Sequence, residues 1–255
     1  MQDQRPATGT PEPRRPTTLA IDVGGAGLKA SVLDATGKLA ADRVRVRTPH
    51  PINPALLVDT LDALIKSLPA FDRVSVGFPG VVRGGVIKTA PNLGTEAFRG
   101  FDLAAALSER LGKRVRVLND ADMQGFAAIK GQGVEMVVTL GTGFGTSIFL
   151  DGSLAPHLEL AHHPFHKGRT YEEELGEKAR KKLGKKKWNR RMEEAIEALR
   201  RLTTFDHLYI GGGNARKLEI ELPGDVSLVD NTAGILGGIK LWDEDGEEGK
   251  GKRET

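Results

Sequence analysis

The fold is decided by two glycine-rich stretches, Leu19-Ala-Ile-Asp-Val-Gly-Gly-Ala-Gly-Leu-Lys29 and Val137-Val-Thr-Leu-Gly-Thr-Gly-Phe-Gly-Thr146. In each stretch, an apolar run that is typical of a β-strand ends in glycines. Glycine lets backbone N–H groups approach a phosphate closely, although a tight hairpin needs glycine too. One such loop is only weak evidence for phosphate binding. Two loops, about half a domain apart, predict two half-domains that face one phosphate-bearing ligand.

The pattern of strands and helices occurs twice. Three strands, a helix, a strand and a helix are expected from residue 18, and strands and helices recur from residue 135. We therefore expect two α/β lobes, residues 17–118 and 119–242, with ligands at the carboxyl ends of the strands. The glycine turns join strand to strand, and no Lys-Ser ending follows them, which argues against a Rossmann fingerprint and a P-loop.

The same pattern predicts individual elements. We expect strands at residues 18–23, 28–33 and 38–47, a helix at 103–111 and a long helix at 172–202 that breaks near Gly184. Residues 1–16 hold four prolines and residues 243–255 are mostly charged or glycine. Both ends are expected to be disordered.

The composition narrows the class of protein. The chain has 255 residues, 39% of them hydrophobic, and a formal net charge of +3, which fits one large domain or two small ones. Cysteine is absent, which excludes disulfides, cysteine nucleophiles and a structural zinc site built on thiolates. No transmembrane run or secretory signal is recognisable. We expect a cytoplasmic protein that binds neither nucleic acid nor a membrane.

The first glycine stretch carries a carboxylate at its strand end. Asp22 is placed to hold Mg²⁺ or its water shell, and Gly24 and Gly25 to approach a phosphate. Lys29 either neutralises phosphate or is solvated on the second strand.

The second stretch has three alternating glycines. Gly141, Thr142, Gly143 and Gly145 exceed what a simple turn requires, and phosphate binding is the favoured interpretation. Gly211, Gly212 and Gly213 end another strand and either pass close to a nucleoside or form a flexible connection.

Candidate acid–base and hydroxyl-binding residues follow other strands. Asn119 and Asp120 open a helix, where they either cap it or supply a general base. Glu159 and His162, three residues apart, face the same side of a helical turn and suit vicinal hydroxyls. Together with His163 and His166, His162 makes a group of three histidines, and such a group offers a metal site as the alternative interpretation. Taken alone, Asn92 predicts only a turn.

A basic segment spans residues 178–191 and contains nine lysines and arginines. A solvated helix face is the simpler explanation. A track for a polyanion is the alternative, because such a segment attracts polyanions through Coulomb forces and counterion release.

Taken together and in order, these motifs resemble the ROK family of sugar kinases, and within it the polyphosphate glucokinases. The matching segments are Ile21-Asp-Val-Gly-Gly-Ala-Gly-Leu-Lys29, Gly77-Phe-Pro-Gly-Val-Val82, Ala90-Pro-Asn-Leu93, Val117-Leu-Asn-Asp-Ala-Asp122, Thr139-Leu-Gly-Thr-Gly-Phe-Gly145, Glu159-Leu-Ala-His162, Tyr209-Ile-Gly-Gly-Gly213 and Asn231-Thr-Ala-Gly-Ile235. Any one segment is weak evidence for this family, but eight segments in the same order are specific for it. The resemblance implies the two-lobed actin/hexokinase-like ATPase fold, in which a ribonuclease H-like motif is duplicated.

The resemblance also assigns roles to residues. It implies that Asp120 is the catalytic base for the 6-hydroxyl of a hexose. It implies that the other sugar hydroxyls are held by Asn92, Asn119, Glu159, His162 and a further glutamate, Glu172 or alternatively Glu173. It places the donor on the loops that contain Asp22, Gly141–Gly145 and Gly211–Gly213.

The implied activity is a glucokinase that uses polyphosphate, ATP or both, with Mg²⁺, in a homodimer. Another hexose or an N-acetylhexosamine is an alternative acceptor, and a sugar- or phosphate-binding protein without turnover is the alternative outside enzymes. Two departures from the family pattern are Ala161, where glycine is usual, and Pro91, where alanine is more usual.

Overall fold

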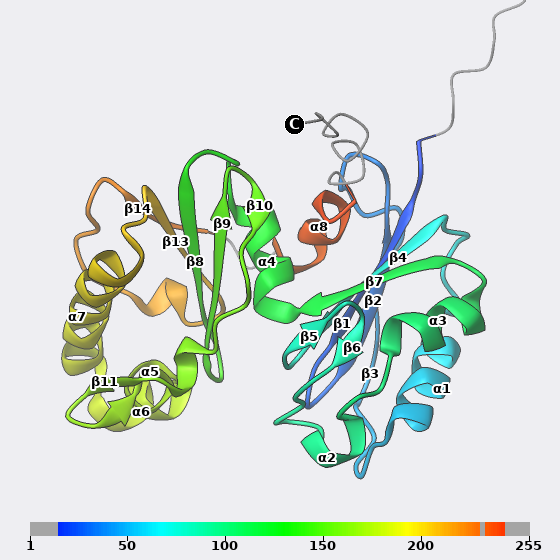
Figure 1. Ribbon diagram of the computed structural model, residues 1–255, viewed down its shortest axis with the longest axis horizontal. Coiled ribbons are helices and arrows are strands. Elements are labelled where there is room, and N and C mark those ends of the chain that lie inside the picture. The colour runs from blue at the N-terminus through cyan, green and yellow to red at the C-terminus, as the bar shows by residue number, and fades with distance from the viewer. Residues whose placement is uncertain (1–14, 230–232, 243–255) are drawn as a thin grey trace, which may run out of the picture.

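Two five-stranded sheets form the framework of the protein, and helices α4 (Asp120–Ala128) and α8 (Ala233–Lys240) lie between them (Figure 1). The structure is a computed structural model that describes residues 15–229 and 233–242. The expected disordered segments 1–16 and 243–255 fall outside the described residues, except for residues 15 and 16. Asn231 of the last family segment also lies outside them.

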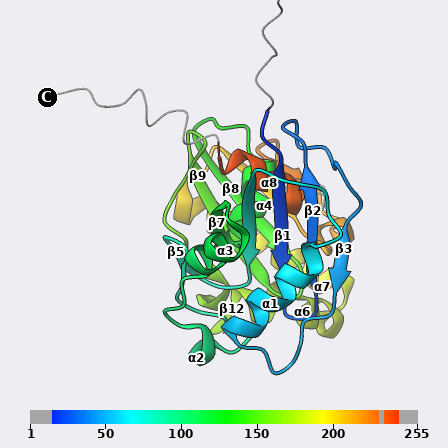
Figure 2. The same cartoon turned by 90° about the vertical axis from the view of Figure 1, so that its right-hand side faces the viewer.

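The first sheet has the order β3-β2-β1-β4-β7. Its parallel strands are β1, β4 and β7, while β2 and β3 continue from β1 as antiparallel hairpins. Helices α1 and α3 cover one face, and α8 packs on the other (Figure 2). The elements are β1 (Thr18–Val23), β2 (Leu28–Leu33), β3 (Val44–Val46), α1 (Pro54–Ile65), β4 (Arg73–Phe78), β5 (Val82–Arg83), β6 (Val86–Ile87), α2 (Thr95–Phe98), α3 (Leu103–Leu111) and β7 (Arg114–Asn119).

The second sheet has the order β10-β9-β8-β13-β14, with β8, β13 and β14 parallel. Helices α5 to α7 lie on one side of it and α4 on the other (Figure 1). The elements are β8 (Val134–Leu140), β9 (Phe144–Leu150), β10 (Ser153–Leu154), the 3-10 turn η1 (Leu160–His162), β11 (Pro164–His166), β12 (Arg169–Thr170), α5 (Tyr171–Leu175), α6 (Glu177–Leu183), α7 (Lys185–Thr203), β13 (His207–Gly211), η2 (Ala215–Lys217) and β14 (Val226–Leu228).

The last helix returns to the first sheet. The hydroxyl of Ser75 on β4 donates a 2.5 Å hydrogen bond to the carbonyl oxygen of Gly238, and the indole of Trp242 donates to that hydroxyl at 2.8 Å. A Cβ atom at Gly237 would overlap the carbonyl oxygen of Met123 on α4. Only a residue without a side chain allows the two helices to pack this closely.

Most predicted elements are confirmed, and two are wrong. The strand expected at 38–47 is reduced to β3, because the intervening polar residues are exposed and only Leu39 forms a bridge to Leu33. The helix expected at 172–202 has the predicted break at Gly184, but a second break at Gly176 divides it into three helices. A Cβ there would lie 2.8 Å from the carbonyl oxygen of Glu172 and 3.0 Å from that of Thr142. The second glycine loop therefore crosses the chain at this break.

Candidate active site

The carboxyl ends of the parallel strands bring the first group of predicted residues to one edge of the first sheet. Asp22 on β1 is in register with Gly77 on β4, which is in register with Leu118 on β7. A Cβ on Gly77 would lie 3.6 Å from the Cα atom of Asp120. Gly77 on β4 therefore lies directly against the first residue of α4.

Asn119 and Asp120 have separate tasks at the start of α4. Asn119 is the N-cap, and its side-chain oxygen accepts a 2.8 Å hydrogen bond from the N–H of Ala121, while its amide donates to the carbonyl oxygen of Gly80 at 3.1 Å. The capping interpretation is therefore correct for Asn119. The Asp120 carboxylate follows as the first residue of the helix, where the macrodipole favours a negative charge.

The electrostatics of Asp120 suit a proton acceptor. Burial raises the pKa of Asp120 to about 6, and the negative charges of Asp22 and Asp122 act in the same direction. A carboxyl with this pKa is ionised near neutral pH and is a stronger base than an exposed one. The charge of Asp22 is therefore close enough to Asp120 to disfavour its ionised form.

The first glycine loop is held by side chains from the segment after β3, which the sequence did not indicate. The hydroxyl of Thr48 donates to the carbonyl oxygen of Gly24 at 2.6 Å, and His50 donates from Nε2 to that of Gly25 at 2.7 Å. A Cβ at Gly25 would lie 3.1 Å from the Cβ of Asn92. The first loop and the predicted sugar-binding Asn92 are therefore neighbours.

Lys29 lies opposite Asp22 in the β1–β2 hairpin, and its Nζ is 2.8 Å from the Asp22 carboxylate. Both side chains remain partly exposed. The Lys29 ammonium group therefore lies beside the first glycine loop, and its charge is partly neutralised by Asp22.

The second glycine loop meets both α4 and α5. A Cβ at Gly145 would lie 2.9 Å from the Cβ of Ala121, the residue after Asp120. A Cβ at Gly143 would lie 2.7 Å from a carboxylate oxygen of Glu172. The loop on the second sheet therefore lies next to the predicted base and next to one of the two candidate glutamates.

The third glycine segment lies against the second. Gly212 has a φ of +90°, and a Cβ there would overlap the backbone of Leu140. Asn214 donates from its side chain to the carbonyl oxygen of Gly141 at 2.9 Å. Gly211–Gly213 thus supports the second loop, with Gly213 exposed.

The structure separates Glu172 from Glu173. Glu173 forms a capping box with Thr170, in which its carboxylate accepts from the Thr170 N–H at 2.9 Å. The Glu173 side chain therefore stabilises the start of α5. Glu172 is exposed, and its carboxylate lies against Gly143 of the second glycine loop.

A histidine that the sequence reasoning missed links the acidic residues. The Nδ1 atom of His157 lies 2.9 Å from the Asp122 carboxylate, and its Nε2 lies 3.2 Å from that of Glu159. Glu159 also lies 3.8 Å from Nε2 of the exposed His162. The available signal was spacing: in an extended segment, residues two apart point to the same side, which pairs His157 with Glu159.

The other histidines do not join this group. His163 lies against the carbonyl oxygen of Pro164, and His166 is 3.5 Å from Glu194. Within residues 15–229 and 233–242, no group of three or more histidine, cysteine, aspartate or glutamate residues is arranged to hold a metal ion.

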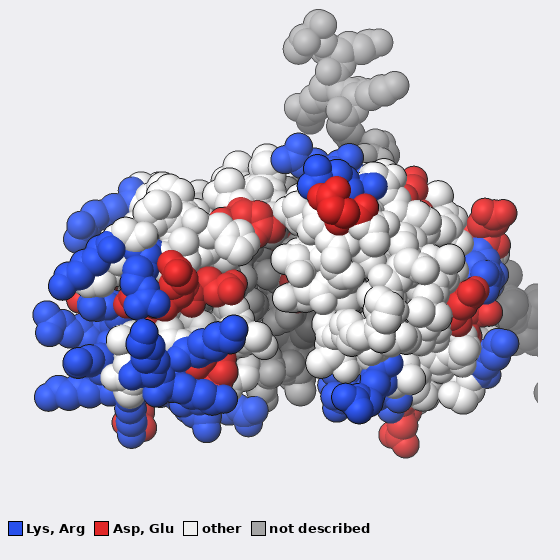
Figure 3. All heavy atoms as spheres, turned by 90° about the horizontal axis from the view of Figure 1, so that it is seen from below, with Lys and Arg blue, Asp and Glu red and all other residues white. Residues whose placement is uncertain are grey.

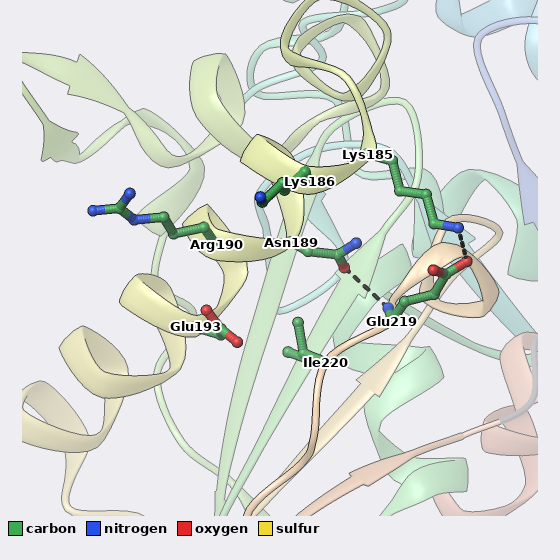
Figure 4. A pocket seen from close by; sticks show the side chains of 7 residues that line it. All are labelled: Lys185, Lys186, Asn189, Arg190, Glu193, Glu219 and Ile220. Atoms are coloured by element: carbon green, nitrogen blue, oxygen red, sulfur yellow. Dashed lines mark hydrogen bonds and ion pairs between the residues drawn. The ribbon is translucent and has the colours of Figure 1, made fainter.

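A surface pocket of about 500 Å³ lies elsewhere, between α7 and the segment before β14 (Figure 4). None of the predicted site residues lines it. Its lining residues are Lys185, Lys186, Asn189, Arg190, Glu193, Glu219 and Ile220.

Comparison with solved structures identifies the fold as that of the actin/hexokinase-like ATPases, and the protein as a sugar kinase. The crystal structure of the polyphosphate/ATP-glucomannokinase from Arthrobacter superposes with a TM-score of 0.78 and 28% identity, over 90% of this chain and 99% of that one. The predicted fold class is thereby confirmed.

The chain belongs to the ROK family, whose family model matches residues 18–157. The polyphosphate glucokinase of Mycobacterium tuberculosis is 31% identical over 234 residues, which cover 85% of this chain and 88% of that protein. An N-acetylmannosamine kinase of Escherichia coli is 33% identical over 143 residues, which cover 54% of this chain and 49% of that protein. No helix within the described part of the chain could span a bilayer.

Proposed function

We propose that this sugar kinase phosphorylates glucose at the 6-hydroxyl, with Asp120 as the general base. The observation that carries the proposal is the position of Asp120, a carboxylate with a pKa of about 6 at the edge that holds the first glycine loop. The next residue along α4 contacts the second loop. Phosphoryl transfer needs mainly alignment and electrostatic stabilisation, which such a junction of loops supplies.

The proposed sugar ligands are Asn92, Asn119, Glu159, His162 and Glu172. They are supported by their positions: Asn92 lies against the first loop, Glu172 against the second, and Asn119 beside the base. Glu159 is tied to α4 through His157 and Asp122. Amide and carboxylate groups from different elements suit the several hydroxyls of one hexose.

The donor phosphates are proposed to lie on the two glycine loops, with Mg²⁺ held by Asp22. The residues present fit this ion, because Mg²⁺ in kinases takes one or two carboxylates together with substrate phosphates. Asp22 is partly exposed, and its charge lies close enough to Asp120 to raise the pKa of that carboxyl. The ion would neutralise phosphate charge, and Lys29 would add to that neutralisation.

A basic surface on α6 and α7 supports polyphosphate as one donor. Lysine and arginine side chains gather over the half of the molecule that carries these helices (Figure 3). Acidic neighbours neutralise part of the surface: Glu177 pairs with Arg180 and Lys181, and Glu219 pairs with Lys185. On α6 and α7, the exposed lysines for which no ion pair is found with the described residues are Lys178, Lys182, Lys186 and Lys187.

This surface connects to the second glycine loop through the start of α6. The N–H of Glu177 donates to the carbonyl oxygen of Thr142 at 3.3 Å. A long polyanion whose end lies on the loop can therefore continue over α6 and α7, attracted by the unpaired lysines.

A kinase assay that crosses a panel of hexoses with ATP and polyphosphate tests the function. We expect glucose 6-phosphate to form with at least one donor and Mg²⁺. A higher kcat/KM for N-acetylmannosamine would favour the alternative acceptor, which the Escherichia coli relative supports. No phosphorylation of any hexose would favour a binding protein without turnover. A homodimer is proposed from the family resemblance alone, and a cytoplasmic location is kept as the expectation from the sequence.

A charge-removal experiment tests the donor. The variant K182Q/K186Q/K187Q should raise the KM for long-chain polyphosphate and flatten its dependence on salt, while the KM for ATP changes little. The matched control K38Q/K66Q/K113Q removes the same charge from exposed sites of the first lobe. Equal effects of both variants, or equal effects on both donors, would contradict the polyphosphate track.

A further inference from the structure

His157 has an unusual position, because it is a nearly buried histidine between two carboxylates. Its side chain is 11% exposed, that of Asp122 is 5% exposed and that of Glu159 is 42% exposed. Both ring nitrogens are within hydrogen-bond distance of a carboxylate oxygen, at 2.9 Å and 3.2 Å. A carboxylate only accepts, so each nitrogen must donate, and the ring carries both protons.

The charge state agrees with this geometry. Burial of the imidazole lowers the pKa of His157, but the hydrogen bonds and charges of Asp122 and Glu159 outweigh burial and raise the pKa to about 10. The imidazolium is therefore retained at neutral pH. Asp122 lies on α4, two residues after Asp120, so the charged ring connects Glu159 to the helix that carries the base.

We propose that His157 is a positioning residue, which fixes the Glu159 carboxylate for its hydrogen bond to the sugar. The inference rests on the proposed function, in which Glu159 binds a hexose hydroxyl. Glu159 is partly exposed, and without a partner its side chain would distribute over several rotamers. The bond from His157 engages Oε1. Oε2 lies 3.8 Å from Nε2 of the exposed His162, beyond hydrogen-bond distance, and can accept from a sugar hydroxyl.

A structural role for His157 is the competing explanation. Asp122 is buried, and a buried carboxylate without a partner destabilises a protein. In that case the bond to Glu159 has no consequence for the sugar. A structural role depends on Nδ1, which pairs with Asp122, whereas the positioning role depends on Nε2, which pairs with Glu159. Substitutions that keep only one of these donors therefore distinguish the two explanations.

Two substitutions separate the nitrogens. In H157N the side-chain amide nitrogen replaces Nδ1 and keeps a donor toward Asp122, but nothing reaches Glu159. In H157Q the amide nitrogen replaces Nε2 and keeps a donor toward Glu159, but Asp122 loses its partner. H163N is the matched control, because His163 is an exposed histidine of the same segment, and E159Q reports what Glu159 itself contributes.

The measurements are the KM and kcat for glucose, the KM for the donor, the dissociation constant of glucose by calorimetry, and Tm. For H157N we expect the KM and dissociation constant for glucose to rise by roughly 10-fold, the loss typical of a hydrogen bond to a charged group. The kcat and the donor KM should change by less than about 3-fold. H157Q should have the lower Tm and the smaller change in glucose affinity, and H157N/E159Q should be no weaker than E159Q.

A purely structural role predicts that H157N, which keeps the donor toward Asp122, binds glucose normally, whereas H157Q loses stability and glucose affinity together, and that result would overturn the inference. Unchanged glucose affinity in H157N, with weakened affinity in E159Q, would also overturn it and leave the proposed function intact. If E159Q binds glucose normally, Glu159 is not a sugar ligand and the inference fails with that assignment. If wild type phosphorylates no hexose, the proposed activity fails, and calorimetry with glucose still decides the role of His157.

Discussion

Replacing Asp120 with asparagine should make the protein more stable and nearly inactive. Asparagine keeps the shape of the side chain and the acceptor that the N–H of Ala121 uses at 2.8 Å. It removes the negative charge that burial and the neighbouring carboxylates of Asp22 and Asp122 disfavour. Loss of a general base typically lowers kcat by about 10²–10⁴-fold. Activity and stability are therefore expected to change in opposite directions.

The size of the gain follows from the pKa. A carboxyl whose pKa rises from 3.8 to about 6 on folding loses about 3 kcal/mol of stability when ionised. Asp120 keeps some contact with solvent, so a gain of about 1–3 kcal/mol is expected for D120N. Between these two pKa values the native state binds the proton more tightly than the unfolded state. Wild type therefore loses stability as the pH rises through this range, and D120N does not.

Urea unfolding at pH values of about 4 and 7.5 measures this difference. The midpoint of D120N should exceed that of wild type at the higher pH, and the gap should close at the lower pH. D42N is the control, since Asp42 is exposed and its replacement should change stability by less than about 0.5 kcal/mol. A D120N protein that is less stable than wild type at pH 7.5 would refute the electrostatic argument. A near-normal kcat would refute the assignment of the base.

Three further predictions concern contacts around the site. G145A should cost about 1–3 kcal/mol and lower kcat, because its Cβ would lie 2.9 Å from that of Ala121; unchanged unfolding and kinetics would contradict the close packing. W188F should lose about 1–3 kcal/mol in urea unfolding, because the buried indole donates to the Leu175 carbonyl at 2.9 Å. The pKa of His157 near 10 implies a stabilising contribution that is complete below pH ~6.5 and is lost as the pH rises toward 10, so the Tm difference between wild type and H157N should shrink over that range.

The sequence predicted elements well where local signals define both ends. β1 and β2 match their predicted residues, because each is a largely apolar run that ends at a glycine or an aspartate. The helix α3 also matches, since Asp102 caps its start and Gly112 ends it with a φ of +60°. The break at Gly176 could not be predicted in this way. It comes from the approach of Thr142, which is distant in sequence.

The site shows the same division between local and distant causes. Glu173 could have been assigned to a helix cap, because Thr170 and Glu173 have the spacing of a capping box. The contacts of Gly143 with Glu172 and of Gly25 with Asn92 depend on how loops meet in three dimensions. The family resemblance therefore supplied roles that spacing alone did not.

The position of the base on a packed helix has a physical reason. Phosphoryl transfer is sensitive to displacements of about 1 Å between the acceptor and donor. Helix α4 begins at the edge of the first sheet and packs along β9 of the second, where a Cβ at Gly125 would lie 2.6 Å from the Phe149 ring. On its other side, Gly237 of α8 leaves no room for a side chain. A carboxylate at the first residue of so tightly packed a helix keeps its distance to both glycine loops, which a carboxylate on a free loop would not.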